Sequence, residues 1–169
     1  LIDWEKTYNI DESFEMSFVF IRATAGNNKV DKRFKDNWKN AKARNLICGA
    51  YHYYRPNENS LEQFENYSAV VALDSGDFIP VLDVEKMGKL GKENLCKGVN
   101  NWLELATKKY GVKPMIYTGR TFYLHYLKGK VDGYPLWIAS YSEKHKLEGI
   151  DWTMHQFSEK VKVKGIKGN

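Results

Sequence analysis

Short runs rich in β-branched and aromatic residues alternate in this chain with amphipathic stretches long enough to form helices. This order favours a mainly parallel sheet with helices packed outside it, and so an α/β fold. The last two runs lie too close together in the sequence for a comfortable helical crossover, so we expect the later strands to lack helices. Six strands are predicted, at Phe18–Thr24, Gly49–Arg55, Pro80–Glu85, Pro114–Gly119, Leu136–Tyr141 and Thr153–Ser158.

Helical signals fill the gaps between the earlier strands. Asp31 and Ser60 are each placed to cap a helix whose apolar residues recur at the spacing of one helix face. A third helix is predicted from about Lys92 to Tyr110, with Gly111 placed to end it, and a short helix follows Gly119. The predicted architecture is a small barrel of parallel strands with an incomplete set of outer helices.

The 169 residues, 43% of them hydrophobic, are enough for one domain with a real core. No internal repeat, linker or long apolar run interrupts them, so residues 1–169 are predicted to form a single domain without a membrane span. The chain opens without an initiator Met or an apolar leader, and we expect that any export signal has been removed or is absent from this sequence. Cys48 and Cys96 are predicted to be buried thiols rather than a disulfide.

The run Pro80-Val81-Leu82-Asp83-Val84-Glu85 ends a predicted strand with two carboxylates. Because side chains alternate along a strand, Asp83 and Glu85 are expected to face the same side, about 6–7 Å apart. Two acids this close do not ionise independently, and such coupling can keep an acid catalyst protonated near neutral pH. The pair therefore suits cleavage of a glycosidic bond, although strand-end acids also pair with Lys or Arg or cap the next helix.

Polar and aromatic residues gather at the ends of the other predicted strands. In a parallel barrel the C-terminal strand ends carry the chemistry, so these side chains are expected to converge on one rim. Tyr and Trp offer a sugar an apolar face and a hydrogen-bonding edge, although any one of them can instead fill the core. His52 is predicted to be a satisfied core histidine. The converging residues are Arg22, the aromatic cluster before Arg55, Tyr117, Trp137, Tyr141, and His155 or Gln156.

Several runs of the sequence resemble the signature segments of glycoside hydrolase family 25, the muramidase-type lysozymes of bacteria, fungi and phages. The runs cover nearly the whole chain in the family's order. The resemblance implies a TIM-like (β/α)5(β)3 barrel. It also implies hydrolysis of the β-1,4 bond between N-acetylmuramic acid and N-acetylglucosamine in peptidoglycan, without a cofactor or metal. The matching runs are Phe18–Thr24, Gly49–Pro56, Pro80–Glu85, Met115–Gly119, Pro135–Tyr141 and Gln156–Ser158.

The resemblance also implies roles for individual residues. Glu85 matches the family's general acid. Asp83 matches the neighbouring carboxylate, which either stabilises positive charge or orients the acetamido group of the substrate in a retaining, substrate-assisted reaction. The predicted spacing of the two acids lies between those of retaining and inverting pairs. The residues expected to line the sugar subsites are Tyr53, Tyr54, Tyr117, Trp137 and Tyr141, with Arg22 and Gln156 also binding substrate.

Two strands of the family pattern have no counterpart in this sequence. Members usually begin with a Gly-Ile-Asp-x-Ser strand and end with a Val-Asp-x-Asn strand, whereas this chain opens at Leu1 and stops at Asn169. The first and last barrel strands, with two of the family's four active-site carboxylates, are therefore expected to lie outside it. Without them the chain is expected to fold poorly, because strand edges stay unpaired. Asp3 is assigned a capping role.

Other functions fit parts of the same pattern. The main alternative to the enzyme is a non-catalytic module that binds cell-wall carbohydrate on the same barrel. A metal-dependent phosphodiesterase-like barrel needs His and additional carboxylates that the pattern lacks. The net charge of +5 fits nucleic acid as well as an acidic wall polymer, but no basic and aromatic recognition motif supports nucleic-acid binding.

The predicted partner is therefore peptidoglycan. The protein is predicted to be a monomer and to act outside the cell or in the cell envelope, where peptidoglycan lies. Part of the positive charge lies in the tail Glu159–Lys167, whose alternating Lys and Val residues indicate a half-exposed strand.

Overall fold

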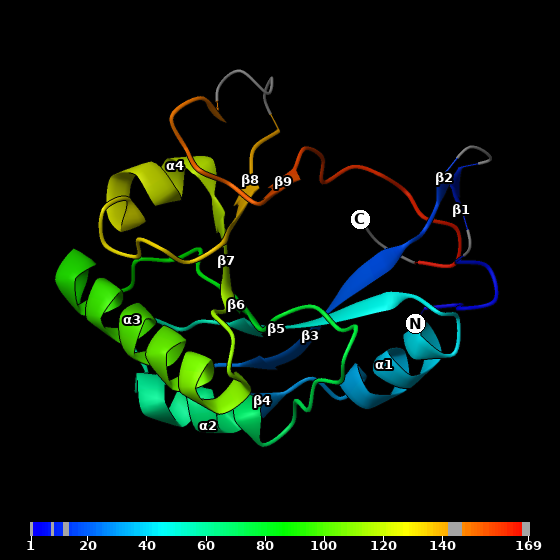
Figure 1. Ribbon diagram of the computed structural model, residues 1–169, viewed down its shortest axis with the longest axis horizontal. Coiled ribbons are helices and arrows are strands. Elements are labelled where there is room, and N and C mark those ends of the chain that lie inside the picture. Colours follow the sequence, from blue (N-terminus) through cyan, green and yellow to red (C-terminus); the bar gives the residue numbers. More distant parts are fainter. Residues whose placement is uncertain (1, 8, 12–13, 142–146, 167–169) are drawn as a thin grey trace.

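The computed structural model describes residues 2–7, 9–11, 14–141 and 147–166. Its main feature is a seven-stranded sheet that curls around a central space (Figure 1). The first two strands of the sheet are antiparallel to each other, and all other neighbours are parallel. The strand order is β4 (Lys29–Val30), β3 (Phe18–Ala25), β5 (Ile47–Tyr53), β6 (Val81–Asp83), β7 (Met115–Gly119), β8 (Leu136–Ala139) and β9 (Met154–Gln156). A separate hairpin joins β1 (Asn9–Asp11) to β2 (Phe14–Glu15).

Helices lie on the outer side of the curled sheet and connect its parallel strands (Figure 1). The helix α1 (Phe34–Lys42) leads from β4 to β5, α2 (Ser60–Ser68) from β5 to β6, and α3 (Gly91–Tyr110) from β6 to β7. A short helix, α4 (Arg120–Phe122), and a π-helical turn, η1 (Tyr123–Leu127), follow β7. Between β8 and β9, the described residues 147–153 contain no α-helix, as the short spacing predicts.

The prediction of a mixed α/β fold is confirmed, and each of the six predicted strands overlaps an observed one. Alternation along these strands divides their side chains between the helices and the central space. On the helix side, Leu82, Ile116 and Ile138 are fully buried and share one apolar cluster with Trp102 and Leu103 of α3. Burial of this face stabilises the sheet and leaves the opposite side chains to the central space.

Two of the predicted helix caps are wrong. Asn59, and not Ser60, caps α2, because its side chain accepts hydrogen bonds from backbone N–H groups of the first turn. Asp31 lies two residues before Arg33, the position that caps α1. Its carboxylate instead accepts the backbone N–H of Arg33, the residue before the helix. Gly111 ends α3 as predicted, with a φ of 71° that favours glycine.

The two ends of the described chain meet at the side of the sheet where β3 and β9 face each other across the opening (Figure 1). Ile2 and Ile166 form an isolated antiparallel bridge, and the Asp3 N–H donates to the Gly165 carbonyl at 2.7 Å. The carboxylate of Asp3 accepts backbone N–H groups of the following turn, which fits its predicted capping role. The predicted strand at Glu159–Lys167 is wrong for its described part. The described residues of that segment form a loop, and their strand-like pairing is limited to the single bridge between Ile166 and Ile2.

His52 and the two cysteines are buried parts of the core, as predicted. The imidazole places Nδ1 2.7 Å from Thr24 Oγ1 and Nε2 3.2 Å from Gln63 Oε1. Burial lowers the pKa of His52 to about 4, so the ring is neutral at physiological pH. Cys48 and Cys96 are both free thiols. Of the helices in the described part of the chain, none combines the length and apolar character that crossing a bilayer requires.

Candidate active site

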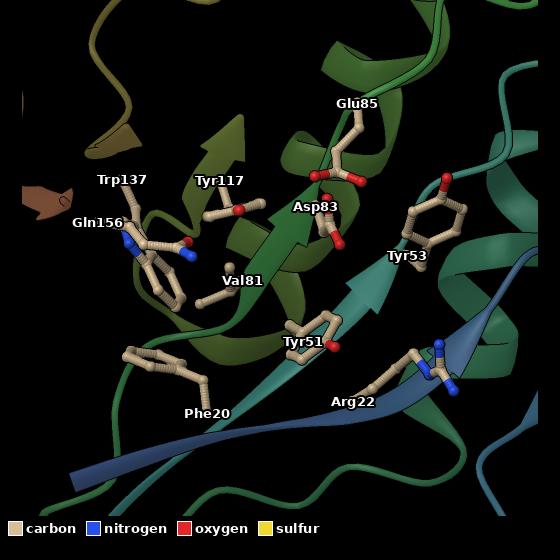
Figure 2. Close-up of a pocket in the computed structure, with 10 residues that line it drawn as sticks. All are labelled: Phe20, Arg22, Tyr51, Tyr53, Val81, Asp83, Glu85, Tyr117, Trp137 and Gln156. Carbon is tan, nitrogen blue, oxygen red and sulfur yellow. The ribbon is translucent and has the colours of Figure 1, made fainter. Parts of the chain in front are cut away.

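Six parallel strands contribute side chains to one pocket of about 490 Å³ inside the curl of the sheet (Figure 2). The contributing residues alternate with the buried residues of the helix-facing side, so the same period of two that builds the core also builds the pocket. The pocket lies toward the C-terminal ends of the strands, the end that carries chemistry in parallel barrels. It is lined by Phe20, Arg22, Tyr51, Tyr53, Val81, Asp83, Glu85, Tyr117, Trp137 and Gln156.

The two carboxyl groups of the central strand and its extension emerge into this pocket together, as the alternation predicts. Val81, Asp83 and Glu85 all line it, whereas Leu82 and Val84 are fully buried on the other side. The two acids differ in depth. Asp83 is only 7% exposed, while Glu85 is exposed to solvent at the mouth of the pocket.

The position of Asp83 below Glu85 gives it an unusual protonation state. Burial, and secondly the negative charge of Glu85, raise the pKa of Asp83 to about 8, although the Arg22 guanidinium opposes the shift. Its Oδ1 atom is buried and has no hydrogen-bond partner among the described residues. Asp83 is therefore mostly protonated at neutral pH, a neutral hydrogen-bonding group that a ligand can satisfy.

The register of the sheet sets Asp83 among aromatic rings. Tyr53 of β5 is aligned with Asp83, Asp83 with Tyr117 of β7, and Tyr117 with Trp137 of β8. Tyr117 and Trp137 also contact each other edge to face, with ring centroids 4.8 Å apart. Burial raises the pKa of Tyr117 well above that of an ordinary tyrosine, so its hydroxyl stays protonated and can donate or accept a hydrogen bond.

Aromatic packing also closes the inner end of the pocket. The ring of Phe20 lies against Trp137 on one side and against Phe78 on the other, with centroid separations of 4.5 and 4.7 Å. Gly49 makes room for this arrangement, because a Cβ at that position would overlap the Phe20 ring. With aromatic rings at its base and Glu85 at its mouth, the site can hold the apolar face of a sugar under an acid.

Polar groups hold the rim of the pocket in place. Arg22 donates from Nε and Nη2 to Asp31 Oδ2, at 3.2 and 3.0 Å. On the opposite side, Tyr141 is 51% exposed and hydrogen-bonds to Tyr117. Gln156 donates to the Ser158 carbonyl at 3.3 Å and lies 3.5 Å from the Tyr141 hydroxyl. Tyr141 therefore supports the rim of the pocket and does not line its interior.

One predicted site residue points elsewhere. Tyr54 is only 2% exposed and packs into the apolar core, with its hydroxyl against Gly98 of α3. Neighbouring residues of an extended chain face opposite sides, so Tyr53 and Tyr54 cannot both enter the pocket. Tyr51 takes the place expected for Tyr54, since it shares the pocket side with Tyr53.

Sequence reasoning missed Tyr51, Phe20 and Val81 as pocket residues. The signal was present, because each lies two residues before a residue that faces the pocket, namely Tyr53, Arg22 and Asp83. Within the described ranges, no three His, Cys, Asp or Glu side chains come together in a group that could hold a metal ion.

Comparison with known proteins gives one consistent family. The family model for glycosyl hydrolases family 25 matches residues 1–166. The uncharacterized protein YegX of Escherichia coli strain K12 is 38% identical over 169 residues, which are 99% of this chain and 62% of that protein. An autolytic lysozyme of Clostridium acetobutylicum is 28% identical over 96% of this chain and 49% of its own length. The chain thus spans less than two thirds of these relatives.

Solved structures agree with the sequence comparisons. A bacterial lysozyme from Streptomyces coelicolor superposes with a TM-score of 0.82 at 25% identity, covering 99% of this chain and 83% of that one. A family 25 glycosyl hydrolase from Bacillus anthracis superposes with a TM-score of 0.76 at 31% identity, covering 85% of this chain and 67% of that one.

Proposed function

Because this chain belongs to glycosyl hydrolase family 25, we propose that it is a lysozyme-type glycoside hydrolase that cuts the glycan strands of bacterial peptidoglycan. The bond cleaved is the β-1,4 linkage between N-acetylmuramic acid and N-acetylglucosamine. The observation that carries this proposal is the joint emergence of Asp83 and Glu85 into a pocket lined by aromatic rings. A carboxyl pair provides acid catalysis and the rings receive a sugar face.

Glu85 is assigned as the general acid. It is the exposed member of the pair, at the mouth of the pocket, where the glycosidic oxygen of a bound saccharide can reach it. That oxygen takes a proton from Glu85 as the bond to the anomeric carbon breaks. The acetamido oxygen of the sugar that contains this anomeric carbon attacks the carbon and forms a cyclic intermediate. Water then opens the intermediate, and Glu85 recovers a proton from that water.

Asp83 is assigned the task of orienting the acetamido group. With a pKa raised to about 8 by burial, Asp83 is mostly neutral at pH 7 and stabilises positive charge at the anomeric carbon only weakly. A neutral carboxyl group with an unpartnered Oδ1 is instead suited to hydrogen bonding with an amide. Of the two roles that the family resemblance leaves open, the burial of Asp83 favours the orienting one.

The sugar subsites are assigned to the rings that line the pocket. Tyr53, Tyr117 and Trp137 form the row next to Asp83, and Tyr51 replaces Tyr54 in the predicted set. Each ring offers an apolar face, and the tyrosines add a hydroxyl. Arg22, Gln156 and Tyr141 are assigned to the polar rim, where ring hydroxyls and side branches of a saccharide emerge.

The finer features of the architecture and setting belong to the same proposal. We assign the curled sheet to a (β/α)5(β)3 barrel, since helices follow its earlier parallel strands and the described residues between β8 and β9 form no α-helix. The protein is assigned to the extracellular space or the cell envelope, because its substrate lies there. Residues 1–169 are assigned to one domain, and the protein is assigned as a monomer.

Replacement of Glu85 by Gln tests the function directly. Glu85→Gln preserves size and removes the proton donor, so release of reducing ends from purified peptidoglycan should fall by roughly 10²–10⁴-fold. Glu104→Gln, on the exposed side of α3, is the matched control and should retain full activity. Sedimentation with insoluble wall separates the main alternative: binding by the wild type without any release of reducing ends indicates a carbohydrate-binding module.

A further inference from the structure

A second, more open hollow of about 590 Å³ adjoins the active-site pocket at the ends of β3 and β5. We name it the basic shelf. Asp31 lines the shelf and accepts the hydrogen bonds of Arg22, which lines the pocket, so an ion pair connects the walls of the two spaces. Figure 2 shows Arg22 at the edge of the pocket, away from Trp137 and Gln156. The basic shelf consists of Asn28, Lys29, Val30, Asp31, Lys32 and Arg55.

Among the residues that line the basic shelf, the cationic side chains of Lys29, Lys32 and Arg55 outnumber the one carboxylate, Asp31. The carboxylates around the shelf are already engaged: Asp31 pairs with Arg22, and Glu58 pairs with Arg55. Glu62 accepts a hydrogen bond from the Asn27 side chain. Lys29 and Lys32 are exposed, and neither has an ion pair within the residues that the structure describes. Two ammonium groups are thus available to an anionic ligand.

The turn that carries these lysines is held firmly by its surroundings. Glu58 Oε2 accepts the Asn27 N–H at 2.7 Å, and the Asn66 side chain donates to the carbonyls of Gly26 and Lys29, at 2.8 and 3.3 Å. Gly26 itself has a φ of 59° and lies too close to Glu58 for a side chain. A turn fixed in this way loses little conformational entropy when it binds a ligand.

From this arrangement we infer that the basic shelf binds the carboxylates of the peptide branch carried by the sugar that occupies the active-site pocket. The inference rests on the proposed function. The peptide is attached to the muramic acid ring and extends about 3.3–3.6 Å per residue. The ion pair between Arg22 of the pocket and Asp31 of the shelf places the two sites next to each other along its path. Because this anion is tethered to the substrate, it has an advantage over free anions, and Lys29 and Lys32 thereby contribute to substrate specificity.

The test compares one wall preparation with and without its peptides. Peptidoglycan is assayed intact and after an amidase has removed the peptide branches, using wild type, Lys29→Gln/Lys32→Gln, and a control Lys108→Gln/Lys109→Gln. The control removes the same charge from exposed residues at the far end of α3. We expect the shelf variant to raise KM for the intact wall about 3–10-fold, at least three times more than for the stripped wall, with kcat unchanged. The control should match the wild type on both substrates.

Three results would overturn the inference: equal losses on both substrates, no loss on either, or a loss that disappears when phosphate polymers are extracted from the wall with the peptides left intact. If the wild type releases no reducing ends, the proposed function fails, and sedimentation then decides the inference separately. Peptide-bearing wall must retain more wild type than shelf variant, and equal retention rejects the shelf as a peptide site.

Discussion

The rings of Phe20 and Trp137 lie 4.5 Å apart, although their strands, β3 and β8, are separated in the sheet by β5, β6 and β7. A flat sheet would hold strands this far apart at about 19 Å, since neighbouring strands are spaced by 4.7–4.9 Å. The contact between Phe20 and Trp137 is therefore possible only because the sheet curls strongly and brings β3 and β8 toward each other. It also explains the pocket, because the two rings close its inner end while the strands between them supply Tyr51, Val81 and Tyr117 to the walls.

Removing the Trp137 ring should weaken saccharide binding more than catalysis. An aromatic contact of this kind contributes about 0.5–1.5 kcal/mol, so Trp137→Ala is expected to raise KM for peptidoglycan roughly 2–10-fold. Trp137→Phe keeps an apolar ring and should recover most of the loss. Steady-state kinetics of both variants provide the measurement, and an unchanged KM in Trp137→Ala would remove this ring from the sugar subsites.

Asp83 should make the protein less stable as the pH rises. Its pKa is about 8 in the folded protein and near 3.8 in the unfolded chain, so between these values the folded state binds more protons. The free energy of unfolding therefore falls with increasing pH across this window, by about 1.4 kcal/mol for each unit of the shift. Asp83→Asn cannot ionise and should show a flatter dependence from about pH 4 to pH 8 in urea unfolding. Parallel curves for the two proteins would contradict the burial argument.

His52 has the opposite dependence on pH. Burial holds its pKa at about 4 in the folded protein, against 6.5 for an ordinary imidazole, so its contribution to stability is present above pH 6.5 and is lost as the pH falls toward 4. In an NMR titration, the ring resonances of His52 should stay constant from neutral pH down to about pH 5. The spectrum of His52→Gln identifies these resonances, and a midpoint near 6.5 would show that the ring is accessible to water.

The contact between Gly98 and Tyr54 predicts a rescue experiment. A Cβ on Gly98 would overlap the Tyr54 hydroxyl in the core, so Gly98→Ala should destabilise the protein by about 1–3 kcal/mol. Tyr54→Phe removes the hydroxyl, and the double variant should regain much of that stability, helped by the better helix propensity of Ala in α3. Thermal unfolding of the single and double variants measures the effect. Additive losses would mean that the hydroxyl does not fill this space.

The assignment of Tyr54 to the core also predicts its kinetics. Tyr54→Phe should leave KM for peptidoglycan unchanged, whereas Tyr53→Ala should raise it, since Tyr53 lines the pocket and Tyr54 does not. Both are measured in the same reducing-end assay. A higher KM for Tyr54→Phe with normal stability would restore Tyr54 to the set of substrate-binding residues.

Local sequence pattern determined much of this fold and of its candidate site. Alternation placed Asp83 and Glu85 on one side of a strand and Leu82 on the other. The short spacing before Thr153 predicted that the described residues between β8 and β9 form no α-helix. The same alternation places Tyr51, and not Tyr54, on the side of the strand that carries Tyr53. These features depend on backbone geometry over a few residues, so they can be read from the chain alone.

The burial of individual side chains and the contacts between distant segments were decided only by the tertiary structure. Asp83 and Glu85 belong to the same predicted strand, yet Asp83 is buried with a raised pKa and Glu85 is exposed. The reason is that Asp83 lies within β6, between the neighbouring strands β5 and β7, whereas Glu85 lies beyond the end of β6. The contact of Phe20 with Trp137 and the ion pair between Arg22 and Asp31 likewise join segments whose meeting depends on the curl and the turns. Solvent access is a property of the whole packed molecule, and for this reason protonation states and the neighbouring shelf could not be predicted from residue order.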